Sequence, residues 1–176
     1  DVSIAELYRQ SGGQLSQVHE RSKAIESFEA ALVFVPDSYK TKVNLAVTLQ
    51  ANGAFEEAVR HFYELNQSRP GEVAVLNSLA WMLATAEEAS LQDPAQAVRY
   101  AEEACSTMEQ PVAALLDSLA AAYAADERFD EAVEVASKAI STAETAGEAR
   151  TADAIRKRLT LYQQKLPFRS PSVRPK

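Results

Sequence analysis

The chain has 176 residues, a formal net charge of −7 at pH 7, 5 Gly, 7 Pro and 1 Cys. Its length fits one domain, and its many alanines with few glycines favour helices over a sheet. A single cysteine excludes an internal disulfide, and no Cys or His spacing suits covalent haem or a zinc site. No apolar run approaches the ~20 residues that span a bilayer. We therefore expect no direct membrane insertion, no metal and no cofactor.

The charge is unevenly distributed along the chain. All 25 acidic residues lie at or before Asp153, and 7 basic residues follow it, so residues 1–153 carry −14 (11 − 25) and the remainder +7. An acidic body does not favour nucleic-acid binding, and we expect no nucleic-acid partner. The basic end either binds an acidic partner or keeps an exposed terminus soluble.

The first predicted repeat, residues 5–38, is irregular. Its second half carries four residues that recur 34 positions later: Ala24, Phe28, Ala31 and Pro36. Gly12 and Gly13 fall inside its first helix, at a cost of ~1 kcal/mol each. Two registers therefore stay open. In the second, a helix ends near Gly12, a loop covers residues 13–19, and the next helix begins at about Arg21.

The second predicted repeat, residues 39–72, is the most regular copy. Its defining positions are Leu45, Ala46, Leu49, Gly53, Ala58, Phe62, Leu65 and Pro70. The apolar spacing predicts two helices that each bury one face. Ala46 and Ala58 are small where the two helices approach closely, and a larger side chain would overpack by ~1–3 kcal/mol. Gly53 supplies a positive φ between the helices, and Pro70 stops the second one.

Two further repeats follow, over residues 73–112 and 113–146. The third is interrupted by an insertion, residues 86–93, after which Asp93 and Pro94 predict a helix N-cap and its first-turn proline. The fourth has the short turn Asp126–Glu131 where the second has Gly53. The repeats thus occupy residues 1–145 overall.

The last predicted helix covers residues 147–166 and caps the repeats. Its apolar seam alternates steps of three and four, with polar residues on the other faces: Ala152, Ile155, Leu159, Tyr162 and Leu166. A terminal helix with a polar outer face closes a stack of repeats. Pro167 ends it. The Pro-rich basic tail, residues 167–176, is expected to be disordered or to dock on a neighbour.

Over roughly residues 5–145 this 34-residue pattern resembles the tetratricopeptide repeat (TPR). The resemblance implies an all-α, right-handed superhelix, or α-solenoid, of about three to four helix-turn-helix repeats plus the capping helix. The segments 76–85, 117–124 and 158–162 are also similar to the C-terminal TPR module of large bacterial multidomain proteins. That likeness implies an alternative role as a docking or assembly module of a larger enzyme or multihaem electron-transfer protein, or as an accessory subunit.

Residue 1 is Asp rather than Met, so we expect a processed or truncated N-terminus. A signal peptide that has been removed leaves no trace. The compartment therefore stays open between the cytoplasm and a bacterial periplasmic or other extracytoplasmic space.

Catalytic chemistry is poorly supplied by this sequence. His61 lies on a predicted second helix, Cys105 has no placed histidine partner, and adjacent acidic pairs do not point together. No phosphate loop or nucleophile motif is present. We expect neither an enzyme nor a small-molecule substrate.

Binding is better supplied, because the resemblance implies that the first helices line a concave groove. The residues there that do not point into the core are Lys40, Val43, Val47, Gln50, Asn77, Trp81, Thr85 and Asp117. Trp81 either anchors a partner peptide or packs on the 86–93 insertion. The sequence predicts a non-catalytic scaffold or adaptor that binds a protein segment or neighbouring subunit in this groove.

Overall fold

A computed structural model describes residues 20–170, which contain eight α-helices and one short 3-10 helix. Within this range the one strand-like feature is an isolated bridge between Ala86 and Ser170. The fold is therefore all-α, as predicted. Both registers of the first repeat before Glu20 lie outside the described residues. The chain divides into two compact units at Pro70–Gly71, and each is described by itself.

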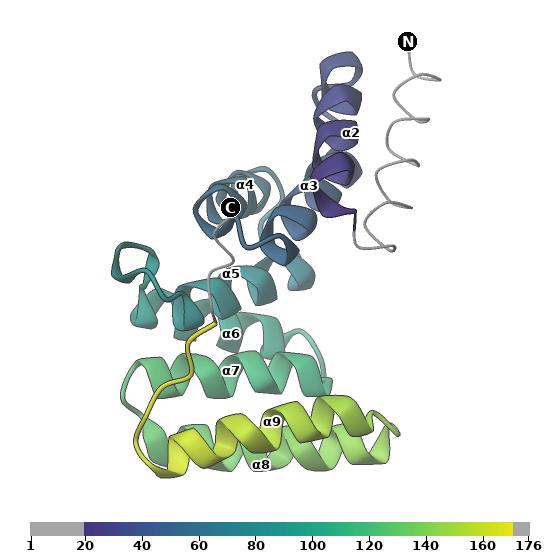
Figure 1. The fold of residues 1–176 in the computed structure, drawn as a ribbon. Helices are drawn as coiled ribbons and strands as arrows, with labels where there is room; N and C mark the ends of the chain where they lie inside the picture. Colours follow the sequence, from purple (N-terminus) through teal and green to yellow (C-terminus); the bar gives the residue numbers. More distant parts are fainter. Residues whose placement is uncertain (1–19, 171–176) are drawn as a thin grey trace. The chain divides into compact units, whose positions relative to one another are not determined.

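The first unit contains α2 (Arg21–Phe34), α3 (Tyr39–Ala51) and α4 (Phe55–Ser68), with α3 packed against both neighbours (Figure 1). Each helix buries one stripe: Ala24, Phe28 and Ala31 on α2, Leu45, Ala46 and Leu49 on α3, and Ala58, Phe62 and Leu65 on α4. Ala46 and Ala58 are fully buried, as expected of small residues at a close helix approach.

The turn between α3 and α4 depends on a left-handed residue. Gly53 has φ of 79°, and the next amide, that of Ala54, donates to the carbonyl of Leu49 over 3.0 Å. This is a Schellman ending, which satisfies a free carbonyl of the last helical turn. The positive φ predicted at Gly53 is confirmed. The equivalent turn after α7 places Glu127 at φ of 62°, where an L side chain costs ~1–2 kcal/mol.

The second unit begins with α5 (Val73–Thr85), the 3-10 helix η1 (Ala89–Leu91) and α6 (Pro94–Ser106). It continues with α7 (Ala113–Ala125), α8 (Phe129–Thr145) and α9 (Ala149–Gln163). Consecutive helices pack in pairs, while α5 also contacts α7 and α7 also contacts α9. The helices α5, α7 and α9 therefore form one layer of this unit, and α6 and α8 form the other (Figure 1).

The helix α6 begins where the sequence predicted it to begin. Asp93 accepts a hydrogen bond from the Gln96 amide at 3.0 Å, and Pro94 is the first helical residue. The predicted N-cap is confirmed. A side-chain oxygen here satisfies one of the amides that every helix leaves unpaired at its start.

Alanine methyl groups dominate the core between α7, α8 and α9. The fully or almost fully buried members are Ala113, Ala120, Ala124, Ala132, Ala136, Ala139, Ala143 and Ala152, closed by Leu116, Ile155 and Tyr162. Small side chains let the helix backbones approach closely, so that many small contacts replace a few large ones.

The last helix ends earlier than the sequence predicted. Lys165 adopts φ of 58°, and the Leu166 amide donates to the Leu161 carbonyl at 3.0 Å, so α9 stops at Gln163. A Schellman ending thus terminates the helix before Pro167 can do so. No helix within residues 20–170 is long and apolar enough to cross a membrane.

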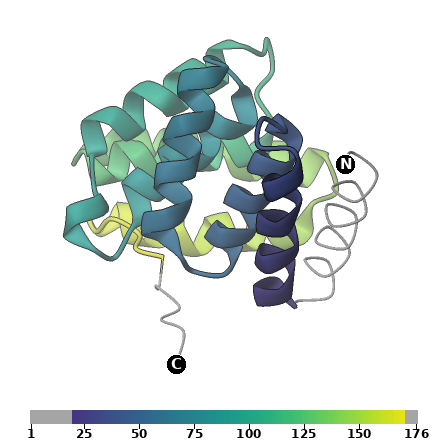
Figure 2. The ribbon, with the colours of Figure 1, turned by 90° about the horizontal axis from the view of Figure 1, so that it is seen from above.

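Residues 167–170 continue as an extended segment that lies against their own chain. It leaves α9 and runs past α7 to the end of α5 (Figures 1 and 2). The alternative of disorder is therefore wrong for these four residues, which dock on helices of their own chain. The rest of the tail lies outside the described residues.

Candidate protein-binding face

Three helices of the second unit each contribute one side chain to a polar and aromatic cluster. Trp81 comes from α5, Asp117 from α7 and Arg158 from α9. Because these helices form one layer, side chains from distant positions of the chain meet on a single surface, which we call the α5–α7–α9 face.

Arg158 organises this cluster. Its guanidinium donates from Nε to Asp117 Oδ1 at 2.9 Å and from Nη2 to Asp117 Oδ2 at 2.5 Å. The same group lies 5.3 Å from the Trp81 ring centroid and 5.4 Å from that of Phe168. The two rings are 5.8 Å apart and tilted by 44°. One planar cation therefore connects a carboxylate with two aromatic rings, a combination that suits arginine better than lysine.

The ion pair is largely withdrawn from water, with 14% of the Arg158 and 12% of the Asp117 side chain exposed. Burial raises the pKa of Asp117 above its ordinary value, and the nearby Arg158 charge and hydrogen bond offset part of that rise. Loss of hydration thus outweighs attraction, as is common for buried pairs.

The extended segment after α9 binds to this face through its main chain and its side chains. The Ser170 amide donates to the Thr85 carbonyl at 2.8 Å, and the Ser170 hydroxyl donates to the Thr85 hydroxyl at 3.1 Å. Arg169 Nη1 donates to the Ala84 carbonyl at 2.6 Å. These carbonyls belong to the last turn of α5, which has no following helical turn to satisfy them.

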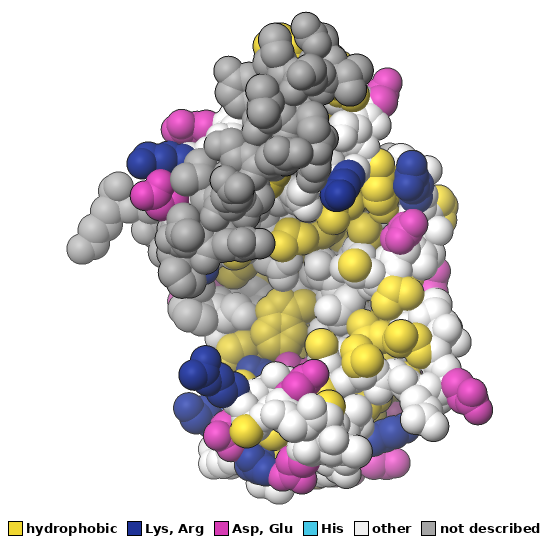
Figure 3. All heavy atoms as spheres, turned by 90° about the vertical axis from the view of Figure 1, so that its right-hand side faces the viewer, with side chains coloured by type: hydrophobic (Ala, Val, Ile, Leu, Met, Phe, Trp, Pro, Cys, Tyr) yellow, Lys and Arg dark blue, Asp and Glu magenta, His cyan; other side chains and the backbone are white. Residues whose placement is uncertain are grey.

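An open pocket of about 320 Å³ lies beside this segment, between Phe168 and one face of α9. Its α9 lining follows the spacing of a single helical stripe: Arg150, Asp153, Ala154, Lys157, Arg158 and Leu161. Lys and Arg side chains lie among Asp, Glu and hydrophobic side chains near the bottom of the surface in Figure 3, at the level of α8 and α9. The pocket thus combines positive charge with apolar walls.

The structure distributes the predicted groove residues between the two units. Lys40 and Val47 are exposed on α3, where Val43 and Gln50 are half-buried. Asn77 is half-buried on α5, and its amide oxygen has no hydrogen-bond partner within the described chain. Trp81, Thr85 and Asp117 come together on the α5–α7–α9 face, where Thr85 is almost fully covered.

Arg158 and Phe168 were not among the groove residues predicted from the sequence. The available signal for Arg158 was Asp117, an acidic residue on an otherwise apolar stretch of α7, which requires a cation when buried. Phe168 stands in a short segment without periodicity, and no local pattern indicated what it would contact.

Other chemically reactive residues within the described part of the chain do not assemble into a site. His61 Nδ1 lies 3.8 Å from a single carboxylate, that of Glu64. Burial raises the pKa of the Cys105 thiol, which makes it a weaker nucleophile at neutral pH. Residues 20–170 contain no group of three or more His, Cys, Asp or Glu side chains that could hold a metal ion.

Comparison with known proteins agrees with this helical architecture. A tetratricopeptide repeat family profile matches residues 40–65 and 112–146. No curated protein matches the sequence of the chain.

Several solved structures share the fold at low sequence identity. MamA from Desulfovibrio magneticus RS-1 superimposes with a TM-score of 0.68 at 15% identity, covering 92% of this chain and 96% of that one. PilW, a type IV pilus biogenesis factor, gives 0.65 at 18% identity, over 92% of this chain and 77% of its own. A thermophilic TPR protein of Thermus thermophilus gives 0.58 at 18% identity, over 91% and 99% respectively.

Proposed function

We propose that this tetratricopeptide-repeat protein is a non-catalytic interaction scaffold that binds an extended segment of a partner protein on the α5–α7–α9 face. One observation carries the proposal: this face already holds an extended polypeptide, residues 167–170 of its own chain. The contacts use an aromatic pair, a guanidinium and main-chain hydrogen bonds, which are the usual means of peptide recognition.

The bound segment forms part of the surface that a partner meets. Phe168 is one wall of the open pocket, and it is held by Trp81 and Arg158. A partner segment then binds beside residues 167–170 rather than replacing them. Such a surface is formed before binding, so little ordering entropy opposes association.

The exposed side of α3 is a second part of the same proposal. Lys40 and Val47 are exposed there, with Val43 and Gln50 beside them. These four residues supply a mixed apolar and polar surface, of the kind seen at the rim of many interfaces. We treat it as a separate contact of the first unit.

Selection of peptides from a displayed random library tests the proposal without a known partner. Peptides enriched on the wild-type chain should bind Phe168→Ala at least tenfold more weakly, because the pocket loses a wall. Lys138→Ala, on the exposed side of α8, is the control and should bind normally. Failure to enrich any peptide, or equal affinity for Phe168→Ala, contradicts the proposal. Tighter binding to Phe168→Ala would show that residues 167–170 compete with partners instead of helping to bind them.

A further inference from the structure

We infer that the pocket between α9 and Phe168 binds an acidic peptide segment that inserts one aliphatic side chain between its charged residues. The inference rests on the proposed function and specifies the partner chemistry of the same face. Its support comes from the charges, spacing and walls of the pocket.

Two cations of the pocket are available to a ligand. The ion pairs that α9 makes within the described chain involve Arg156 and Arg158, which leaves the exposed side chains of Arg150 and Lys157 unpaired there. Arg158 is already neutralised by Asp117 and contributes mainly its planar surface. The attraction for a carboxylate therefore comes from Arg150 and Lys157.

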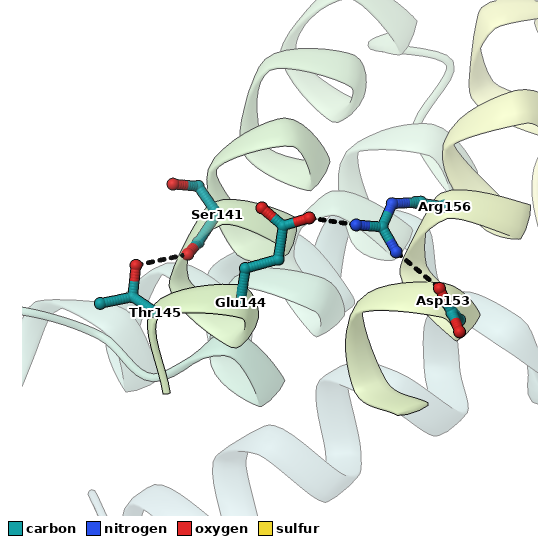
Figure 4. A network of polar contacts seen from close by, with 5 residues as sticks. All are labelled: Ser141, Glu144, Thr145, Asp153 and Arg156. Carbon is teal, nitrogen blue, oxygen red and sulfur yellow. Dashed lines mark hydrogen bonds and ion pairs between the residues drawn. The ribbon is translucent and has the colours of Figure 1, made fainter. Parts of the chain in front are cut away.

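The one carboxylate that lines the pocket is drawn to another partner. Asp153 Oδ1 accepts from Arg156 Nη1 at 2.6 Å, and Arg156 also bonds to Glu144 on α8 (Figure 4). In this three-residue network, Arg156 neutralises part of the negative charge of Asp153 on the side of α9 that faces α8. Asp153 consequently offsets the two unpaired cations less than an isolated carboxylate would.

The spacing of the cations suits an extended ligand. Arg150 and Lys157 are seven residues apart on one helix, a separation of about 10 Å along its axis. An extended peptide covers that distance in about three residues. In the polyproline II form of an extended chain, which repeats every three residues, acidic residues three positions apart lie on one side of the peptide and can each meet one cation.

Part of the pocket surface beside the two cations is apolar. Ala154 lies between Arg150 and Lys157 on the same stripe, and its small side chain leaves room above the helix. Leu161 and Phe168 close the pocket at one end. A side chain such as leucine, placed between the two acidic residues, buries its surface here and contributes affinity that charge alone does not provide.

A peptide fits these features better than a nucleic acid does. The chain as a whole carries −7, which repels a polyanion, whereas two unpaired cations attract a short acidic segment locally. Aliphatic walls match a peptide side chain, and residues 20–170 offer no row of exposed aromatic side chains for stacking bases at this pocket.

A fluorescent peptide with two glutamates three positions apart and a leucine between them is the direct probe. Fluorescence anisotropy measures its affinity for the full chain at low and physiological salt. Two matched peptides carry lysines in place of the glutamates, or serine in place of leucine. The test variant is Arg150→Glu/Lys157→Glu. The matched control, Arg99→Glu/Lys138→Glu, makes the same charge change at exposed residues of α6 and α8.

We expect the acidic peptide to bind more weakly as salt increases. Its affinity should fall tenfold or more in Arg150→Glu/Lys157→Glu, and less than threefold in the control. The serine peptide should bind several-fold more weakly and the lysine peptide not at all. Circular dichroism should show that both double variants keep their helices, because all four side chains are exposed.

Four results of the binding assays would each overturn the inference. They are no measurable binding of the acidic peptide, equal binding of the acidic and lysine peptides, equal loss in both double variants, or tighter binding of a single-stranded oligonucleotide than of the peptide. A change of sedimentation coefficient in Arg150→Glu/Lys157→Glu alone would assign the pocket to a second copy of the chain instead. If the peptide library gives ligands that bind Phe168→Ala more weakly but are not acidic, the proposed function stands and this inference fails.

Discussion

Removing Arg158 should destabilise the second unit more than removing Asp117, although the two side chains form one ion pair. Breaking a buried pair from one side costs ~3–5 kcal/mol, because the remaining charge stays unpaired. Arg158→Ala also loses contacts with the Trp81 and Phe168 rings, each worth ~0.5–1 kcal/mol. We therefore expect about 4–7 kcal/mol for Arg158→Ala and about 3–5 kcal/mol for Asp117→Ala.

Urea unfolding at pH 7 gives these free energies, and the double variant Asp117→Ala/Arg158→Met tests their origin. With no charge left unpaired, its cost should be at least ~2 kcal/mol below the sum of the single variants. Hydrogen exchange of the Ser170 amide should accelerate in Arg158→Ala, because Phe168 loses its support. Additive free energies, or unchanged exchange at Ser170, would refute the proposed organisation around Arg158.

The pH dependence of this pair has a definite sign. Burial raises the pKa of Asp117 in the folded chain above its unfolded value near 4. The folded state then holds the proton more tightly than the unfolded state does. The contribution of Asp117 to the free energy of unfolding is therefore full below pH ~4 and is lost as the pH rises through the folded pKa. The free energy of unfolding of the wild type minus that of Asp117→Asn should therefore be larger at pH 4 than at pH 7. A difference that increases with pH would contradict the raised pKa.

Three smaller predictions concern single positions and can be checked by denaturant unfolding. Glu127→Gly should stabilise the chain by up to ~1 kcal/mol, since glycine adopts the φ of 62° without strain; a loss of stability would show that the Glu127 side chain matters. Asp93→Ala should lower the free energy of unfolding by ~1 kcal/mol through the lost N-cap of α6, whereas Asp93→Ser should retain most of the stability that the N-cap provides. Tyr162→Phe should be neutral or stabilising by up to ~1 kcal/mol, because the buried Tyr162 hydroxyl has no hydrogen-bond partner within the described residues; a marked destabilisation would indicate an unseen partner.

The sequence was sufficient to predict features encoded by neighbouring residues. The apolar spacing predicted helices packed in pairs, Gly53 predicted a left-handed turn, and Asp93 predicted a helix start. Each depends on residues within one or two helical turns. The position of the turn at Asp126–Glu131 was equally clear, but its left-handed residue is Glu127, whose side chain gives no hint of a positive φ.

Features made by distant residues were not predictable in the same way. The partner of Asp117 lies 41 residues away, and the partner of Thr85 lies 85 residues away. A periodic pattern specifies which face of a helix is buried but not which single side chain covers it. Trp81 was expected not to point into the core, yet its contact with Phe168 required the path of the chain after α9.

Peptide binding by the predicted groove residues stays a prediction. Three of them, Trp81, Thr85 and Asp117, are engaged by side chains or main chain of the same molecule. A partner would contact them mainly through what they hold in place, above all Phe168 and Arg158. The experiments on Phe168→Ala and on the pocket between α9 and Phe168 test whether a partner binds in this way.

The bonds between Thr85 and Ser170 have a consequence for how the second unit folds. In an ideal repeat array each helix pair meets only its neighbours, so helices can be gained or lost one pair at a time from an end. Here the last described residues return to the first helix of the unit, and an end that would otherwise fray is tied to the beginning. Such closure adds long-range contacts, which slow folding and make unfolding more cooperative. The second unit should then melt as one block, while a chain ending at Gln163 should unravel stepwise from α9.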